Sequence, residues 1–150
     1  MSPNANDERI DTQDPMPLHL IKLCVGIDSV ADLRAWRAHR AAQGHRSVAP
    51  TRQTPKRAAE LLDGGSLYWV IKGQVLVRQA IDEIVTEEGG PQPCRIYLKP
   101  DLIETAPQPR RAFQGWRYLE AADAPPDLAV AGEEAVPQDL ARQLRELGAW

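Results

Sequence analysis

The chain has 150 residues, of which 43% are hydrophobic and 26% charged, and its formal net charge is −3. This composition is that of a soluble globular protein, and the length suits one domain that buries its own core. No apolar run approaches the ~20 residues of a membrane helix. Residues 1–15 also lack the basic start and the apolar stretch of a secretory signal. We therefore expect a cytoplasmic protein without membrane contacts.

The charges are unevenly distributed along the chain. Residues 33–59 carry seven Lys and Arg side chains and no Asp or Glu. Residues 120–150 carry seven acidic side chains against two arginines, and residues 1–17 carry four acids against one arginine. A basic block between acidic ends predicts a local anion-binding surface on a protein that is not basic as a whole.

The chain is expected to begin with a disordered leader, a strand and a helix. Residues 1–15 are polar and show no hydrophobic period. Residues 18–25 alternate so that one face is wholly apolar and the other partly so, which predicts a strand near the middle of a sheet. Ser29 is a favourable N-cap for a helix that continues to about Gln43 and ends at Gly44. The side chains expected on its buried face are Val30, Leu33, Trp36 and the stem of Arg37.

A loop and a short helix are predicted next. Residues 45–53 are rich in Arg, Ser, Thr and Pro, which is typical of a loop. The Thr54-Pro55 pair is typical of a helix start and predicts a short helix over residues 55–62. Gly64 is expected to end that helix in the left-handed conformation.

A series of strands follows. Residues 66–72 alternate regularly, and Gly73 indicates either a hairpin turn or a bulge within one bent strand. Residues 75–86 change their apolar parity partway, which predicts a bend or a bulge. Residues 94–98 form a further strand, and residues 102–106 form either a short strand or a loop.

The remaining segments complete an α+β pattern. Residues 107–111 are expected to be extended and exposed because they hold prolines and arginines. A linker over residues 121–136 leads to a helix that starts at Pro137 and carries a leucine stripe. We predict a bent, mainly antiparallel sheet or a partly open barrel, flanked by helices and followed by the C-terminal helix. The expected divisions are an extension over residues 1–15, one domain over 16–128, and the linker with its amphipathic helix over 129–150.

A resemblance to a known family is carried by the stretches LHLIKLCVGIDS (18–29), PKRAAELLDGGSLYWVIKG (55–73), VRQAI (77–81), and FQGWRYL with DAPPDL (113–119 and 123–128). Residues 18–128 thereby resemble an uncharacterised alphaproteobacterial family, domain of unknown function 1489. The resemblance implies one domain after an N-terminal extension, and it implies no activity and no catalytic residue. The chain is also similar in outline to the PUA-like domains, including the ASCH and EVE types. The likeness lies in the order of a helix that ends in glycine, a strand with an aromatic residue, a glycine turn and a strand with an arginine. PUA-like domains are small bent barrels, and many of them bind RNA or modified bases.

Cations and flat side chains suited to nucleic acid recur along the chain. Arg52 and Lys56 flank the predicted helix start, whose backbone N–H groups would favour a phosphate. Trp69 is expected in the core, whereas Tyr68 and Trp116 suit either core or surface. We therefore expect a non-enzymatic domain that binds RNA or another nucleotide-containing ligand. The candidate binding residues are Arg46, Arg52, Lys56, Arg57, Tyr68, Lys72, Arg78, Gln79, Arg110, Arg111, Trp116 and Arg117.

Other interpretations stay open on the sequence. A small enzyme or small-molecule binder would use a pocket near Trp69, Lys72 and Arg78, and a protein-interaction module would use the helix over residues 137–150. In a purely structural interpretation, the arginines are solvated or pair with the acidic ends. No histidine lies at metal-ligand spacing from a cysteine or carboxylate, and no phosphate-loop or nucleophile motif is present, so we predict no metal, no cofactor and no catalytic residue.

Overall fold

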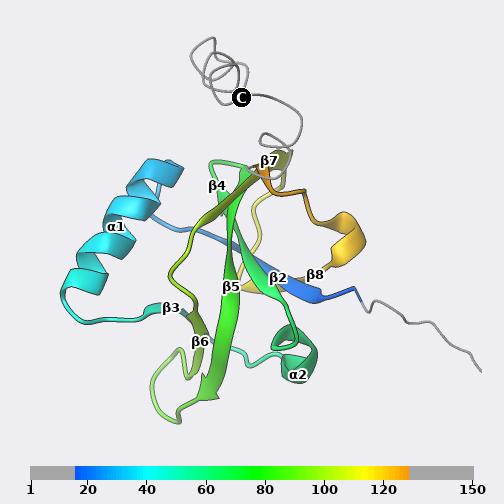
Figure 1. Ribbon diagram of the computed structural model, residues 1–150. Coiled ribbons are helices and arrows are strands. Elements are labelled where there is room, and N and C mark those ends of the chain that lie inside the picture. Colours follow the sequence, from blue (N-terminus) through cyan, green and yellow to red (C-terminus); the bar gives the residue numbers. More distant parts are fainter. Residues whose placement is uncertain (1–15, 129–150) are drawn as a thin grey trace, which may run out of the picture.

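The computed structural model describes residues 16–128 as an α+β fold built on one seven-stranded sheet (Figure 1). The strands are β2 (Leu18–Leu23), β3 (Ser47–Thr51), β4 (Ser66–Ile71), β5 (Gln74–Thr86), β6 (Cys94–Leu98), β7 (Ile103–Pro109) and β8 (Trp116–Glu120). Their order is β3-β6-β5-β4-β2-β8, and β7 pairs with β5 outside this path. Only β2 and β4 are parallel, and among the described residues β3 and β8 do not pair with each other. The sheet is therefore mainly antiparallel and open.

Strand β5 is long and bends through the centre of the fold. Its first part pairs with β4 and β7, and its last part, from Ile81 onwards, pairs with β6. The register with β6 shifts between Ile81 and Glu83. This irregularity confirms the bend predicted from the change in apolar parity, because one extra residue moves the following side chains to the other face.

A two-residue turn joins β4 to β5. Ile71 lies opposite Gln74, and the turn residues Lys72 and Gly73 have φ angles of 51° and 81°. Positive φ at both central positions is the geometry of the tight hairpin turn that matches the twist of the strands. The hairpin alternative is therefore confirmed, and the single bent strand is excluded.

The first helix, α1 (Val30–Ala42), confirms its predicted caps. The Ser29 side chain accepts a hydrogen bond from the backbone N–H of Asp32 at 3.0 Å, and Gly44 has a φ of 85°. The helix flanks one side of the sheet (Figure 1). Its buried face is narrower than predicted, because Leu33 is its only buried residue, and the expectation that Trp36 is buried is wrong: it is 48% exposed.

The second helix, α2 (Ala58–Leu61), is shorter than predicted. It begins three residues after Pro55, and the Thr54 hydroxyl bonds the Thr86 hydroxyl at 2.8 Å instead of capping the helix. Gly64, with a φ of 90°, confirms the predicted left-handed end. The Thr54-Pro55 pair predicted the wrong N-terminus for this helix because the Thr54 side chain bonds a residue of β5.

Strand β3 corrects the prediction of a loop over residues 45–53. Ala49 and Thr51 are buried and pair with Ile96 and Cys94 of β6. Pro50 lacks a backbone N–H, and such a residue is tolerated in a sheet when its strand lies at the edge, as β3 does. Strand β7 begins at Ile103, which confirms the strand alternative for all but the first of residues 102–106. It extends into the predicted exposed segment as far as Pro109.

Two hydrophobic clusters cover the two faces of the sheet. Alternate residues of β2, β4 and β5 join α1 and α2 in the larger cluster, which includes Leu20, Leu33, Leu61 and Trp69. The strand residues that alternate with these point to the opposite face of the sheet. They form a smaller cluster of Ile21, Tyr68, Val70, Val75 and Leu119, with Phe113 packed against it. Ile21 of this cluster and Phe113 line a cavity on that face of the sheet.

The predicted linker and C-terminal helix of residues 129–150 lie outside the described residues. Within residues 16–128, no helix combines the length and apolarity needed to cross a membrane.

Candidate anion-binding site

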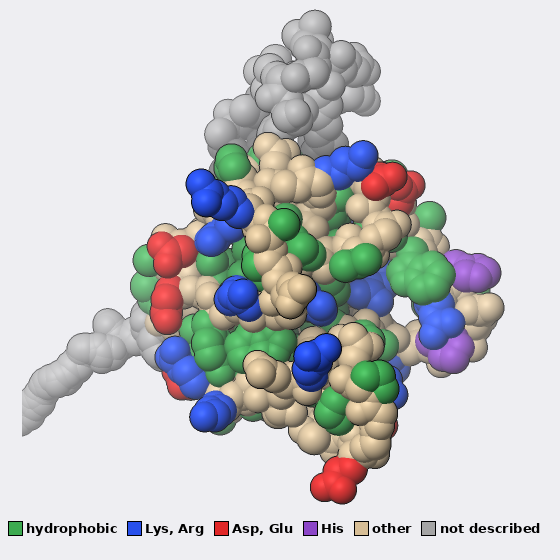
Figure 2. Space-filling view, turned by 180° about the vertical axis from the view of Figure 1, so that it is seen from behind, with side chains coloured by type: hydrophobic (Ala, Val, Ile, Leu, Met, Phe, Trp, Pro, Cys, Tyr) green, Lys and Arg blue, Asp and Glu red, His purple; other side chains and the backbone are tan. Residues whose placement is uncertain are grey.

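The basic block of residues 33–59 does not form one surface. Arg46 pairs with Asp82 and Glu83 at 3.1 and 3.0 Å, and its guanidinium lies 3.9 Å from the ring centroid of Tyr97. Arg57 makes two hydrogen bonds to the Glu60 carboxylate, at 2.7 and 2.8 Å. These three acids lie outside the acidic chain ends, whereas Glu120, which lies 3.7 Å from the Arg57 guanidinium, belongs to residues 120–150. Both arginines are thus paired within the described domain. Figure 2 shows Lys and Arg side chains spread over the back of the molecule rather than gathered in one patch.

The predicted phosphate site at the start of the short helix is not formed. Helix α2 has four residues, and the backbone N–H before it, that of Arg57, donates to the Tyr118 hydroxyl at 3.1 Å. Arg52 and Lys56 are exposed here, and among the described residues no carboxylate pairs with either of them. Without the helix N-terminus, these two cations lack a framework that would hold an anion.

Two of the candidate binding residues, Tyr68 and Gln79, are buried in the sheet. Tyr68 is 4% exposed and meets the ring of His19 edge-on at 5.0 Å, and burial raises the pKa of its hydroxyl. Gln79 is fully buried; it accepts the indole N–H of Trp69 at 3.0 Å and donates to the Lys99 carbonyl at 3.0 Å. The expectation that Trp69 is core is confirmed, Tyr68 takes the core alternative of the two left open, and Gln79 is not available as a binding residue on the surface. A glutamine in a core strand is explained by the polar groups it satisfies.

Arg78 makes an internal ion pair. Its guanidinium donates twice to the Asp127 carboxylate, at 2.7 and 2.8 Å, and once to the Ser66 hydroxyl at 2.8 Å. The side chains of Arg78 and Asp127 are only 22% and 21% exposed. This bidentate pair lowers the pKa of Asp127, mainly through the hydrogen bonds from Arg78. Arg78 thus ties the segment after β8 to strand β5.

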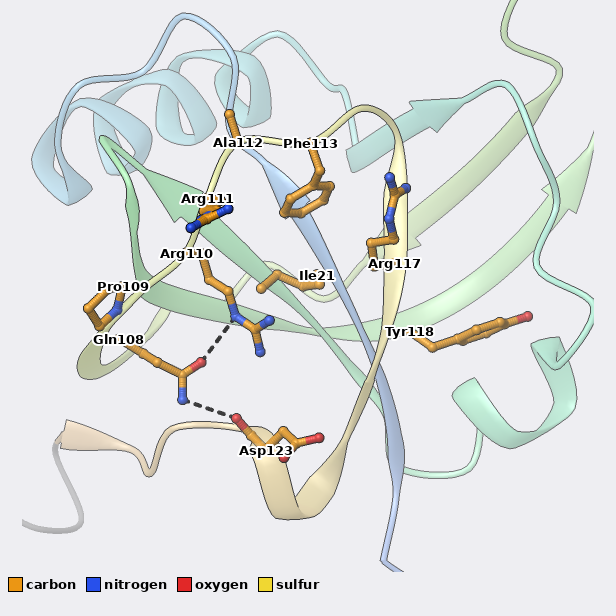
Figure 3. Close-up of a pocket in the computed structure, with 10 residues that line it drawn as sticks. All are labelled: Ile21, Gln108, Pro109, Arg110, Arg111, Ala112, Phe113, Arg117, Tyr118 and Asp123. Atoms are coloured by element: carbon orange, nitrogen blue, oxygen red, sulfur yellow. Dashed lines mark hydrogen bonds between the residues drawn. The ribbon is translucent and has the colours of Figure 1, made fainter.

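Three of the predicted cations do converge, on the face of the sheet opposite α1 and α2. Arg110, Arg111 and Arg117 line a cavity of about 730 Å³, named here the arginine cavity. Ile21 of β2 lies at its floor and Phe113 at its wall (Figure 3). Within residues 16–128, no carboxylate forms an ion pair with any of the three arginines.

The backbone of Arg110 is anchored to the β4–β5 turn. Its N–H donates to the Gly73 carbonyl at 2.8 Å. Its side chain is oriented by Gln108, whose carbonyl oxygen lies 3.4 Å from the Arg110 Nε and whose amide donates to the Asp123 carbonyl at 3.1 Å (Figure 3). A chain of hydrogen bonds therefore links β7 to the turn after β8 across the cavity.

Arg117 reaches the cavity because its position on β8 pairs with Ile21, so that both side chains leave the same face. It donates to the backbone carbonyls of Gln114 and Trp116, and its guanidinium lies 5.2 Å from the ring centroid of Phe113. These contacts hold a guanidinium plane and an aromatic ring side by side at the wall of the cavity.

The neighbouring candidates on β8 and the hairpin lie elsewhere. Trp116 is half-buried on the other face, where its indole N–H donates to the Gln53 carbonyl at 2.9 Å and its ring meets that of Tyr118. Tyr118 contributes to the lining of the cavity, but Figure 3 shows its ring directed away from Ile21 and Arg110. Lys72 stands at the tip of the β4–β5 turn, with its amine 3.8 Å from the Asp28 carboxylate.

The lining residues that were not among the candidates include Phe113, Gln108 and Asp123. Phe113 begins the stretch FQGWRYL, and its even spacing from Arg117 and Leu119 of β8 was a signal that it lies on the same face as they do. Gln108 and Asp123 carried no signal, because their positions depend on the contact between β7 and the turn after β8. Among the described residues, no three His, Cys, Asp or Glu side chains are grouped to hold a metal ion.

Residues 20–150 match the model of a family described as a protein of unknown function, DUF1489. The chain belongs to this family. The resemblance stated from the sequence is thereby confirmed, whereas the likeness to PUA-like domains is not shown by any comparison. No curated protein and no solved structure matches the chain.

Proposed function

We propose that this protein binds single-stranded RNA through the arginine cavity. The observation that carries the proposal is the convergence of Arg110, Arg111 and Arg117 around one concavity with Phe113 at its wall. Guanidinium groups bind phosphate oxygens through paired hydrogen bonds, and a base stacks on an aromatic ring or on a guanidinium plane. Both kinds of surface meet here.

The size and polarity of the cavity support a nucleotide-containing ligand. Its volume of about 730 Å³ lies within the range of roughly 300–1,000 Å³ of small-ligand sites. Three arginines and one acid, Asp123, favour an anion that also carries hydrogen-bond donors, as amino-bearing nucleobases do. The likeness in outline to PUA-like domains, many of which bind RNA, is consistent with this choice and is part of the proposal.

The alternative enzyme pocket receives less support. Trp69 is buried in the larger cluster, Arg78 is paired on the opposite face, and Lys72 is exposed at the hairpin tip. These three side chains line no common cavity among the described residues.

The test measures the anisotropy of a labelled single-stranded RNA of about ten nucleotides at about 50 mM salt. The double variant Arg110→Ala/Arg111→Ala should weaken binding at least about tenfold, because each lost charge-assisted hydrogen bond contributes about 1.5–3 kcal/mol. The matched control Arg52→Ala/Lys56→Ala makes the same change in charge on exposed side chains away from the cavity, and it should change the affinity less than about twofold.

The two variants separate this site from the one predicted on the basic loop. Equal weakening by both would indicate nonspecific attraction, and a larger loss in the control would move the site to residues 52–56. Absence of binding by the wild type at this salt concentration would overturn the proposed function.

A further inference from the structure

A second cavity adjoins the arginine cavity. It has a volume of about 240 Å³, and Arg110 and Ala112 line both cavities. Its other walls are largely apolar, with Leu23, Val25 and Val70 among them, and Lys72 and Gly73 stand at its hairpin end. The two cavities are thus neighbours that share one short segment of backbone.

The two cavities differ in chemistry. The arginine cavity offers three guanidinium groups, whereas the second has mostly aliphatic walls, with the shared Arg110 and Lys72 as its two cations. The aliphatic walls suit the flat apolar faces of a base and disfavour a phosphate away from these two cations. Val25, 86% exposed, places apolar surface in water beside this cavity, and a base would cover it.

The cations at the junction are held by the backbone. Arg110 is bonded to the Gly73 carbonyl, and Lys72 occupies the neighbouring turn position with a φ of 51°. The contact of Lys72 with Asp28 is long, at 3.8 Å, and both side chains are well exposed, at 66% and 74%. An exposed pair of this kind contributes little, so the Lys72 amine can exchange the carboxylate for a phosphate at small cost.

We propose that the site takes an RNA segment of at least two nucleotides, with phosphate groups at the arginine cavity, one base in the second cavity, and Lys72 on a flanking phosphate. This inference rests on the proposed function and deepens it, because it makes an RNA chain rather than a free mononucleotide the ligand.

The test compares the dinucleotide ApA with AMP as competitors of the labelled RNA. ApA carries about one negative charge and AMP about two, so attraction to the arginines alone would favour AMP. We expect ApA to compete at a concentration at least about tenfold lower, because it adds a second base to the contact. We also expect Lys72→Ala to weaken binding of the labelled RNA several-fold. The affinity of AMP, measured by its competition with the RNA, should be the same for this variant as for the wild type.

A second readout uses the cysteines. Cys24 lines the second cavity and is half-buried, whereas Cys94 is fully buried and serves as an internal control. Burial raises the pKa of Cys24 to about 11, so its alkylation is followed by mass spectrometry over hours. ApA should slow the alkylation of Cys24, and AMP should not.

The outcomes distinguish the inference from the function on which it rests. If RNA binds but AMP competes as well as ApA, or if ApA leaves Cys24 unprotected, the two-nucleotide site is wrong while RNA binding stands. If no RNA binds, both are overturned.

Discussion

At the scale of single residues, the polar side chains of the sheet serve structure rather than ligand binding. His19 is 6% exposed, and its Nδ1 accepts the backbone N–H of Ser66 at 2.9 Å. Tyr68, Arg78 and Asp127 surround it. Burial, with a smaller effect of Arg78, lowers the pKa of His19 from 6.5 to about 4. The histidine is therefore neutral in the folded protein at neutral pH.

His19 should make stability fall as the pH falls from 6.5 to 4. In this window the unfolded chain binds a proton on His19 and the folded chain does not, so protonation favours unfolding. The loss at pH 4 relative to pH 7 should be about 2 to 3 kcal/mol. His19→Asn keeps an acceptor near the Nδ1 position and removes the titration, so urea unfolding should show a shallower pH dependence. His45→Asn, at an exposed position, is the control, and identical profiles for wild type and His19→Asn would contradict the prediction.

At the scale of elements, α1 is attached to the sheet through a small contact. Leu33 is 1% exposed and enters the larger cluster, with Val30 packed against it from the first turn. Trp36 turns outward, where the Arg40 guanidinium lies 5.5 Å from its ring centroid. The Arg37 guanidinium lies over the ring of Trp69, 5.7 Å from its centroid. Arg37 thus lies on the face of the helix predicted for it, whereas Trp36 does not.

Truncation of Leu33 and of Trp36 should lower the stability by unequal amounts. Leu33→Ala removes the one buried side chain of α1 and should lower the free energy of unfolding by about 3 kcal/mol. Trp36→Ala removes a larger but exposed side chain and should cost less than about 1 kcal/mol. Urea unfolding of both variants provides the measurement, and a larger loss for Trp36→Ala would show that the helix docks by the predicted face.

At the scale of the whole molecule, the placement of charge rather than its amount defines the candidate site. The net charge is −3, and three of the seven cations in residues 33–59 pair with acids of β5, α2, β7 and β8. Arg110, Arg111 and Arg117 come from a shorter stretch without acids, residues 105–119, and they gather on one face because β7 and β8 bracket it. Attraction to RNA should therefore be local.

This local attraction sets the salt dependence of binding. The three arginines and Lys72 would make four phosphate contacts to a single strand, which predict a slope of about −3 in a plot of log affinity against log salt concentration. Arg110→Ala/Arg111→Ala should reduce the slope to about −1.4, and Arg52→Ala/Lys56→Ala should leave it at about −3. Anisotropy titrations at several salt concentrations measure these slopes, and a slope that is the same in all three proteins would contradict the assigned contacts.

Local sequence determined most of the individual elements. The Ser29 cap, the left-handed Gly64, the hairpin at Gly73 and the alternating strands depend on residues close together in the chain, so their patterns could be interpreted directly. The exceptions were the edge strand β3, whose ladder depends on β6, and the start of α2, where Thr54 bonds a residue of β5.

Tertiary structure alone decided which functional side chains come together. The burial of Tyr68 depends on the segment that covers its face of the sheet. The availability of Arg46 and Arg78 for a ligand depends on acids that lie far along the chain. The arginine cavity arises from the register of β8 against β2 and from the hydrogen bond of Arg110 to the hairpin. Ion pairs and cavities are formed by residues that are distant in the sequence, and the hydrophobic period of a single segment carries no information about such distant partners.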